Sequence, residues 1–152
     1  MQEFQTADDV LDFAIANEEE AYSFYTELAT SAANPAMRAV FQQFALEEQG
    51  HKGKLLAVKR GKQVLVSGGE KVADLSIGDY LVHAAPHPGM TYQEALIVAM
   101  QKEKTAFKLY MDIAGAVLDP TLHETFLGLA MEEAKHKLRF ELEYDERVLA
   151  GN

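Results

Sequence analysis

Two copies of the motif Glu-x-x-His are the residues of this sequence best suited to chemistry. Glu48 precedes His51 by three positions, and Glu133 precedes His136 by three. Residues three apart on a helix lie one turn apart on the same face, so each pair could offer a carboxylate and an imidazole to one metal ion. One such motif is a weak signal, because Glu and His occur at this spacing on many exposed helices. Two copies at equivalent positions of a repeat are a stronger signal.

An internal repeat relates the two motifs. Residues 14–55 align with residues 99–140 at a constant offset and without a gap, and twelve positions are identical. Composition alone would give roughly two or three identities in such a window. The chain is therefore read as two related halves.

Each half predicts a pair of antiparallel helices. Both halves open with a Thr followed three residues later by an acid, and both are interrupted by an Asx-Pro pair that starts a second helix. These four starts are Thr6 with Asp9, Asn34-Pro35, Thr91 with Glu94, and Asp119-Pro120. We expect one all-α domain over 1–152, a four-helix bundle with helices at about 7–32, 35–60, 92–117 and 120–149. The remaining connection, 61–90, is long enough to cross the bundle; Gly68-Gly69 indicates a loop, and 74–81 a short helix.

Helical phase separates two pairs of adjacent glutamates. Glu48 and Glu133 lie in register with large apolar residues one and two turns earlier, so they are expected to face the core. Glu47 and Glu132 lie in register with more polar positions. We assign these two to the surface or to the surroundings of the site.

The other two long helices each supply one inward carboxylate, Glu18 and Glu103, at equivalent positions of the repeat. Four carboxylates buried together would be costly without cations. The predicted metal ligands are Glu18, Glu48, His51, Glu103, Glu133 and His136. One Glu from each of two helices and Glu-x-x-His from each of the others is a dinuclear ligand set. Its oxygen and nitrogen donors suit two iron ions, and manganese or zinc would also fit.

Tyr25 and Tyr110 follow Glu18 and Glu103 by seven residues, two helical turns along the same face. We expect their phenols to hydrogen-bond carboxylates near the metals. The alternative is that both are ordinary aromatic residues of the core. We expect no catalytic side chain beyond the metal ligands and no further cofactor.

Gly50 and Gly53 flank His51 inside a predicted helix, where each glycine costs about 1 kcal/mol relative to alanine. Two interpretations stay open. The glycines either permit a close approach near His51, or they weaken the helix without consequence.

Composition narrows the partners and the location. Twenty-four acidic against fourteen basic residues give a formal charge of −10, which disfavours nucleic acid and anionic membranes as partners. There are no cysteines, so disulfides, iron–sulfur clusters and cysteine-ligated iron are excluded. The first residues form neither a signal peptide nor a membrane span, and we therefore expect a cytoplasmic protein.

Four segments resemble rubrerythrins of the ferritin-like superfamily, and the similarity extends over nearly the whole sequence. The segments are NEEEAYSFYTELA around Glu18, FALEEQGHKGKL around Glu48 and His51, QKEKTAFKLYMDIA around Glu103, and AMEEAKHKLRF around Glu133 and His136. The resemblance implies a ferritin-like four-helix bundle with a non-haem diiron centre, in which Glu48 and Glu133 bridge the metals. It further implies reduction of peroxide or oxygen by iron that cycles between diferrous and diferric states.

The sequence departs from rubrerythrins at two points. Without cysteine there is no rubredoxin-type iron site, so electrons are expected from an external electron-transfer protein. Ala106 stands where rubrerythrins carry a further carboxylate ligand, one turn beyond Glu103. The resemblance and the long apolar helix faces favour a homodimer.

Two other functions stay open. One is a ferroxidase for iron storage of the bacterioferritin type, which also uses two Glu-x-x-His motifs. Against it, the fourth helix is expected to run almost to the last residue, which leaves no segment for the short additional helix common in cage-forming ferritins. The other is a non-catalytic bundle whose ions only neutralise the inward carboxylates.

Overall fold

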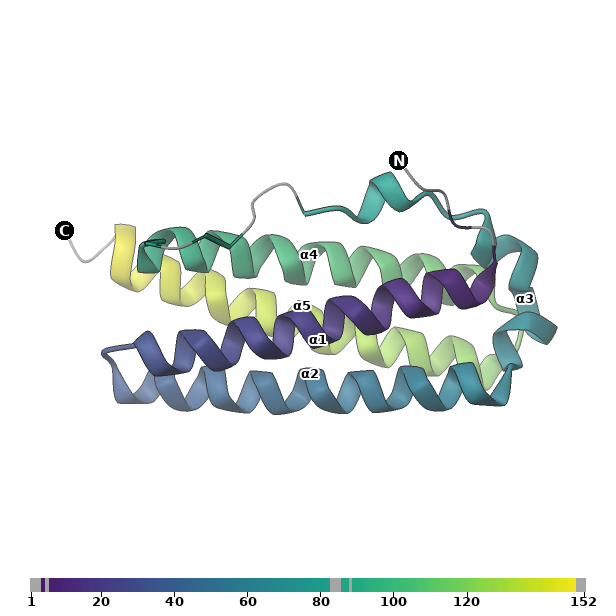
Figure 1. Ribbon diagram of the computed structural model, residues 1–152, viewed down its shortest axis with the longest axis horizontal. Coiled ribbons are helices and arrows are strands. Elements are labelled where there is room, and N and C mark those ends of the chain that lie inside the picture. The colour runs from purple at the N-terminus through teal and green to yellow at the C-terminus, as the bar shows by residue number, and fades with distance from the viewer. Residues whose placement is uncertain (1–3, 5, 83–85, 88, 150–152) are drawn as a thin grey trace.

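Four long helices lie side by side along one axis in the computed structural model, which describes residues 4, 6–82, 86–87 and 89–149 (Figure 1). They form two antiparallel pairs, and the described residues contain no strand. The pairs are α1 (Ala7–Ser31) with α2 (Pro35–Gly61), and α4 (Tyr92–Ala116) with α5 (Pro120–Tyr144). The expected all-α bundle of two repeated helical hairpins with a long crossover is thereby confirmed.

The helices begin where local capping places them. In α1, the Thr6 hydroxyl accepts from the amide of Asp9, and the Asp9 carboxylate accepts from the amide of Thr6, both at 3.1 Å. Thr91 and Glu94 repeat this reciprocal pair at the start of α4. In α2 and α5 an Asn34 or Asp119 side chain caps a helix whose first residue is proline. These caps satisfy amides that have no partner within the helix.

The helix ends differ slightly from the expected ones. Helices α1 and α4 each end one residue early, because Ala32 and Val117 take extended backbone conformations. Helix α2 continues to Gly61, where Lys62 adopts a left-handed conformation that ends it. The expected fourth helix is α-helical only to Tyr144 and is followed by a π-helical turn, η2 (Asp145–Leu149).

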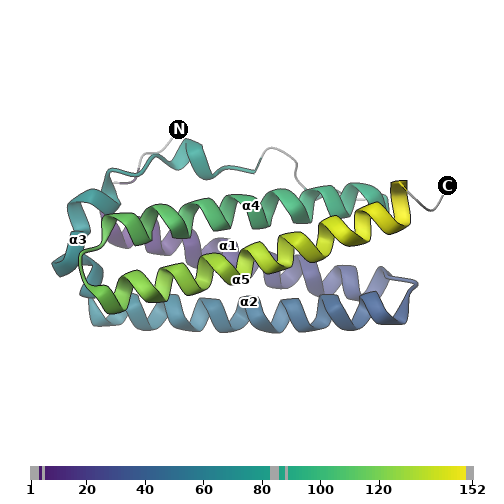
Figure 2. The same cartoon turned by 180° about the vertical axis from the view of Figure 1, so that it is seen from behind.

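The connection between the two hairpins contains a helix that the sequence did not predict, α3 (Gln63–Ala73). It packs across the end of the bundle, with Val64 and Val72 buried (Figure 2). Gly68 lies not in an open loop but at a kink within α3, where its backbone is not helical, and a Cβ there would overlap the carbonyl oxygen of Ala116 in α4. Glycine is therefore required at this position for the close approach of α3 to α4. The sequence shows two adjacent glycines but not the helix that packs against them.

The short helix expected at 74–81 is a 3-10 turn, η1 (Ile77–Tyr80). Its buried Tyr80 donates a hydrogen bond to Asp112 of α4 at 2.7 Å, which ties the connection to the side of the bundle. Residues 83–85 and 88 of the expected crossover lie outside the described residues.

The buried apolar side chains form two clusters, one toward each end of the bundle. Along α2, for example, Phe41 belongs to one cluster and Leu55 to the other, with Glu48 and His51 between them. The bundle thus places a short polar layer between two apolar layers. No helix among the described residues is long and apolar enough to cross a membrane.

Candidate metal centre

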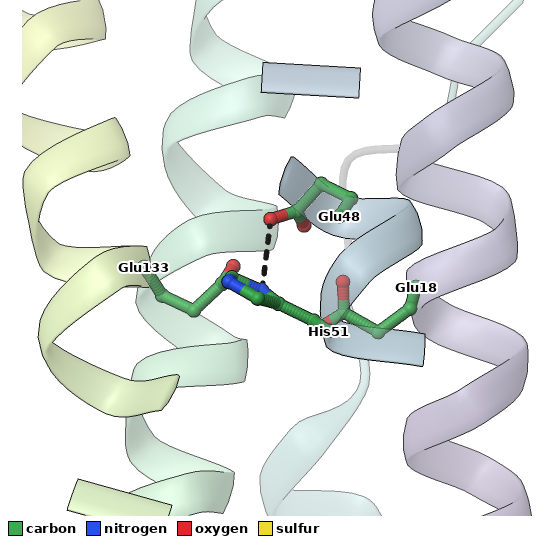
Figure 3. A group of neighbouring side chains, drawn as sticks. All are labelled: Glu18, Glu48, His51 and Glu133. Atoms are coloured by element: carbon green, nitrogen blue, oxygen red, sulfur yellow. Dashed lines mark ion pairs between the residues drawn. The ribbon is translucent and has the colours of Figure 1, made fainter. Parts of the chain in front are cut away.

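The six predicted ligand side chains converge in this polar layer. Helices α1 and α4 each contribute one glutamate, and α2 and α5 each contribute one Glu-x-x-His pair. None of the six is more than 4% exposed to solvent. Figure 3 shows how Glu18, Glu48, His51 and Glu133 point toward one another from three different helices.

The six side chains form two overlapping groups. One consists of Glu18, Glu48, His51 and Glu133, and the other of Glu48, Glu103, Glu133 and His136. Within each group, one donor atom per residue lies within 4.8 Å of the others. Glu48 and Glu133 belong to both groups, so the site has two lobes that share two carboxylates.

Glu48 occupies the centre of the site. Its Oε1 lies 3.3 Å from Nδ1 of His51 and 3.3 Å from Nδ1 of His136. The two imidazole rings are nearly parallel, with an interplanar angle of 14° and centroids 6.3 Å apart. Because both rings direct Nδ1 inward, each lobe receives one nitrogen donor.

Many of the donor atoms have no hydrogen-bond partner in the part of the chain that the structure describes. They include both oxygens of Glu133, one oxygen each of Glu18, Glu48 and Glu103, and Nδ1 of both histidines. Even Nδ1 of His51, which lies 2.7 Å from Oε1 of Glu133, is not aligned for a hydrogen bond. Unsatisfied buried polar atoms are rare and costly, and here they are all of the types that bind metal ions. The residues therefore fit a pair of metal ions.

Burial and mutual repulsion disturb the protonation of the metal-free carboxylates. Burial, together with the negative charge of Glu48, raises the pKa of Glu18 to about 8. The same two causes raise the pKa of Glu103, and burial with repulsion from the other carboxylates raises that of Glu133 well above its usual value. The pKa of Glu48 is lowered, because interaction with the two imidazoles outweighs its burial.

The pKa values of both imidazoles are raised, although burial alone would lower them. Burial alone would lower the pKa of His51, but interaction with Glu18 and Glu48 raises it to about 9. Interaction with Glu103 and Glu48 likewise outweighs burial and raises the pKa of His136 to about 10. Metal-free, the site therefore holds protons at neutral pH that arriving cations must displace.

The phenols of Tyr25 and Tyr110 both hydrogen-bond carboxylates of this cluster. Tyr25 donates to Glu103, and Tyr110 donates to Glu18, so each phenol serves the glutamate of the other half of the repeat. Both tyrosines are fully buried, which raises the pKa of each phenol well above its usual value. The phenols therefore remain hydrogen-bond donors that hold these carboxylates in place.

A cavity of about 270 Å³ leads to the carboxylates from the face formed by α1, α4 and the crossover connection. Glu18, Glu48, Glu103 and Glu133 all line it. Its remaining wall includes the half-buried Ala106, and Tyr80 and Leu81 of the connection. Alanine at position 106 thus leaves open space beside the site where rubrerythrins are expected to carry a carboxylate.

Glu47 and Glu132 lie outside the two lobes, half-buried, as the sequence predicts. The sequence did not predict that both would approach the same imidazole. One oxygen of each and a nitrogen of His136 form a third group of close donor atoms. Glu132 and His136 are four residues apart on α5, a spacing that the sequence shows, whereas only the packing of α2 against α5 brings Glu47 to the same imidazole.

Fold and site together define a ferritin-like helical bundle with a buried cluster of carboxylates and imidazoles. Residues 9–72, which include Glu18, Glu48 and His51, match the rubrerythrin family. This match confirms the resemblance seen in the sequence motifs, and together with the buried cluster it supports a diiron protein.

A crystal structure from Thermotoga maritima, of a protein proposed to be of the ferritin-like diiron-carboxylate type, has the same fold. The TM-score is 0.80 at 19% sequence identity, over 97% of this chain and 100% of the other. No curated protein matches the sequence significantly.

Proposed function

We propose that this protein is a non-haem diiron redox protein that reduces peroxide or oxygen with electrons from an external donor. The observation that carries the proposal is the pair of overlapping donor groups that share Glu48 and Glu133. Two lobes with two common carboxylates suit two metal ions held close together better than two independent sites.

The proposed ligand roles follow from the two groups. Glu18 and His51 would hold a metal ion in one lobe, Glu103 and His136 would hold one in the other, and Glu48 and Glu133 would be shared by both lobes. Two ferrous ions bound there would supply the two electrons that, with two protons, convert one hydrogen peroxide to two waters. The surrounding residues hold the donors in place, because Tyr25 and Tyr110 fix the terminal glutamates and the apolar clusters exclude bulk water.

The cavity beside Ala106 gives a small oxidant a path to the site. Its volume of about 270 Å³ accommodates peroxide or dioxygen together with several waters. Tyr80 and Leu81 also line it, so the crossover connection covers part of the cavity.

Partners and assembly stay predictions. An external electron donor is expected because the chain has no cysteine for an iron site of its own. The expected homodimer is compatible with exposed apolar side chains on α5, namely Met131, Leu138 and Leu142. Light scattering on the metal-loaded protein would test the dimer.

The function can be tested by anaerobic reconstitution with ferrous iron, followed by metal analysis and then by repeated additions of hydrogen peroxide with an excess of artificial reductant. Two irons per chain and many peroxides consumed per chain are expected. A large shell that mineralises iron would instead identify a ferroxidase of the storage type. Two retained ions without peroxide consumption would identify a non-catalytic bundle, and either result would refute the proposal.

A further inference from the structure

The two glutamates next to the ligand motifs meet on the outer side of the proposed centre. Oε1 of Glu47 lies 3.6 Å from Nε2 of His136. Oxygens of Glu47 and Glu132 and a nitrogen of His136 all lie within 4.8 Å of one another. This third group joins α2 to α5, on the side that does not face the cavity beside Ala106.

The imidazole of His136 points to a ligand independently of the acidic pair. Its side chain is 1% exposed, and its Nε2 has no hydrogen-bond partner among the described residues. Nδ1 of the same ring faces the inner carboxylates Glu48 and Glu103. One buried ring therefore offers an unsatisfied nitrogen to each side.

The two carboxylates of the outer group are partly open to solvent, with side-chain exposures of 30% for Glu47 and 37% for Glu132, whereas His136 is buried. A cavity of about 560 Å³ lies over the group, lined by Glu47, Glu132 and His136, by residues of α2 and by Arg139, whose guanidinium contacts the sulfur of Met37. Lys135, which also lines it, lies 3.6 Å from Oε1 of Glu132, but its side chain is 72% exposed. An arriving cation can therefore displace this ammonium group into water without breaking a buried contact.

We propose that Glu47, Glu132 and Nε2 of His136 form an outer site for a divalent cation, through which metal ions reach the dinuclear centre. Two carboxylate oxygens and an imidazole nitrogen are suitable ligands for ferrous iron and similar ions. Since an imidazole can coordinate through either nitrogen, His136 links the outer site to the inner lobe that it shares with Glu48 and Glu103. Once the inner lobe is filled through Nδ1, the Nε2–H group can donate to Glu47 and keep the ring oriented.

This inference rests on the dinuclear centre of the proposed function, but not on its redox activity. Metal ions and the oxidant would then use different faces of the bundle. Metal ions enter between α2 and α5, whereas the small oxidant enters beside Ala106 between α1 and α4.

The test measures the rate at which the metal-free protein takes up Co²⁺ under anaerobic conditions. The visible absorbance of the bound Co²⁺, recorded in a stopped-flow instrument, reports the uptake. The variant is Glu47→Gln with Glu132→Gln. The matched control is Glu19→Gln with Glu20→Gln, which removes the same charge from α1. Glu20 lines the opposite cavity, so the control also tests entry by that route. Equilibrium dialysis then gives the final number of ions per chain.

We expect the Glu47/Glu132 variant to load at least about tenfold more slowly, because acidic clefts concentrate cations locally. Its endpoint should still be two ions per chain, and the control should load within about twofold of the parent protein. Equal slowing of both variants, or no slowing of either, would refute the outer site but leave the dinuclear centre unaffected. A parent endpoint below one ion per chain would refute the dinuclear centre itself, and the outer site with it.

Discussion

Tyr25 donates its phenol hydrogen bond across the bundle to Glu103, a glutamate from the other half of the repeat. Tyr110 does the reverse, toward Glu18. The two hairpins are therefore joined by a reciprocal pair of buried hydrogen bonds that end on proposed metal ligands. Each half of the repeat therefore orients one carboxylate of the other half, namely Glu103 or Glu18.

Replacing Tyr25 by Phe tests this coupling. The variant leaves an oxygen of Glu103 unsatisfied, so the metal-free protein should lose about 1–3 kcal/mol of unfolding free energy. Loss of the orienting donor should also weaken metal binding, by about 10- to 100-fold. Urea unfolding and competitive metal titration measure the two effects. Tyr22→Phe, at a half-buried position on the same helix, is the control and should change neither.

Glu48 and His136 should be indispensable for metal binding. Glu48→Gln weakens the central bridge of both lobes, and His136→Ala removes the nitrogen donor of one. Either change should reduce iron content after reconstitution well below two ions per chain, measured by mass spectrometry of the metal. Glu19→Gln, at an exposed position outside the donor groups, is the control and should still reach two. If both ligand variants retained two ions, the ligand assignment would be wrong.

The metal-free protein should become less stable as the pH rises from 5 to 9. The folded-state pKa of Glu18 is raised from 4.5 to about 8, so the folded protein binds more protons than the unfolded chain over this range. The imidazoles of His51 and His136, raised from 6.5 to about 9 and about 10, act in the same direction at higher pH. A group of this kind contributes stability below its unfolded pKa that is lost as the pH rises through its folded pKa.

Thermal unfolding at several pH values in high salt measures this dependence, since salt screens the general charge of −10. The melting temperature should fall between pH 5 and pH 9, and it should fall less in Glu18→Gln, which lacks one of the groups. The metal-loaded protein should show a smaller fall, because cations replace the protons. A rise in melting temperature for the metal-free protein would contradict the prediction.

Filling the cavity beside the site should impede the oxidant. Ala106→Leu adds three carbon atoms to the wall of a cavity of about 270 Å³. We expect normal iron content but a reaction with peroxide slowed about tenfold, equivalent to ~1.4 kcal/mol of barrier. Ala39→Leu, on the opposite face of the bundle, is the control for stopped-flow kinetics. Unchanged kinetics in Ala106→Leu would mean that the oxidant uses another path.

The glycines should divide into two classes. A Cβ at Gly50 or Gly53 meets nothing within 4 Å, so the structure does not support the close-approach interpretation for either. Gly50→Ala should stabilise the protein by about 0.5–1 kcal/mol through helix propensity. Gly68→Ala should destabilise it by about 1–3 kcal/mol, because the new methyl group overlaps Ala116. Urea unfolding of the metal-free variants checks the opposite signs.

The sequence by itself determined the helix starts and the inward-facing residues. Thr6, Asn34, Thr91 and Asp119 cap their helices through contacts within three residues, so no distant part of the chain is needed to predict them. Burial of Glu48 and Glu133, in contrast to Glu47 and Glu132, follows from helical phase alone. Their role as metal ligands stays a prediction until ions are counted.

Only the tertiary structure decided which residues of different helices meet. Helical phase places Tyr25 and Glu18 on one face, but the packing of α1 beside α4 gives each phenol to the opposite glutamate. The need for glycine at position 68 depends on where α3 crosses the end of α4. The approach of Glu47 to His136 depends on how α2 packs against α5. Helix periodicity fixes directions around one axis, whereas these contacts depend on distances between axes, which only the packed bundle sets.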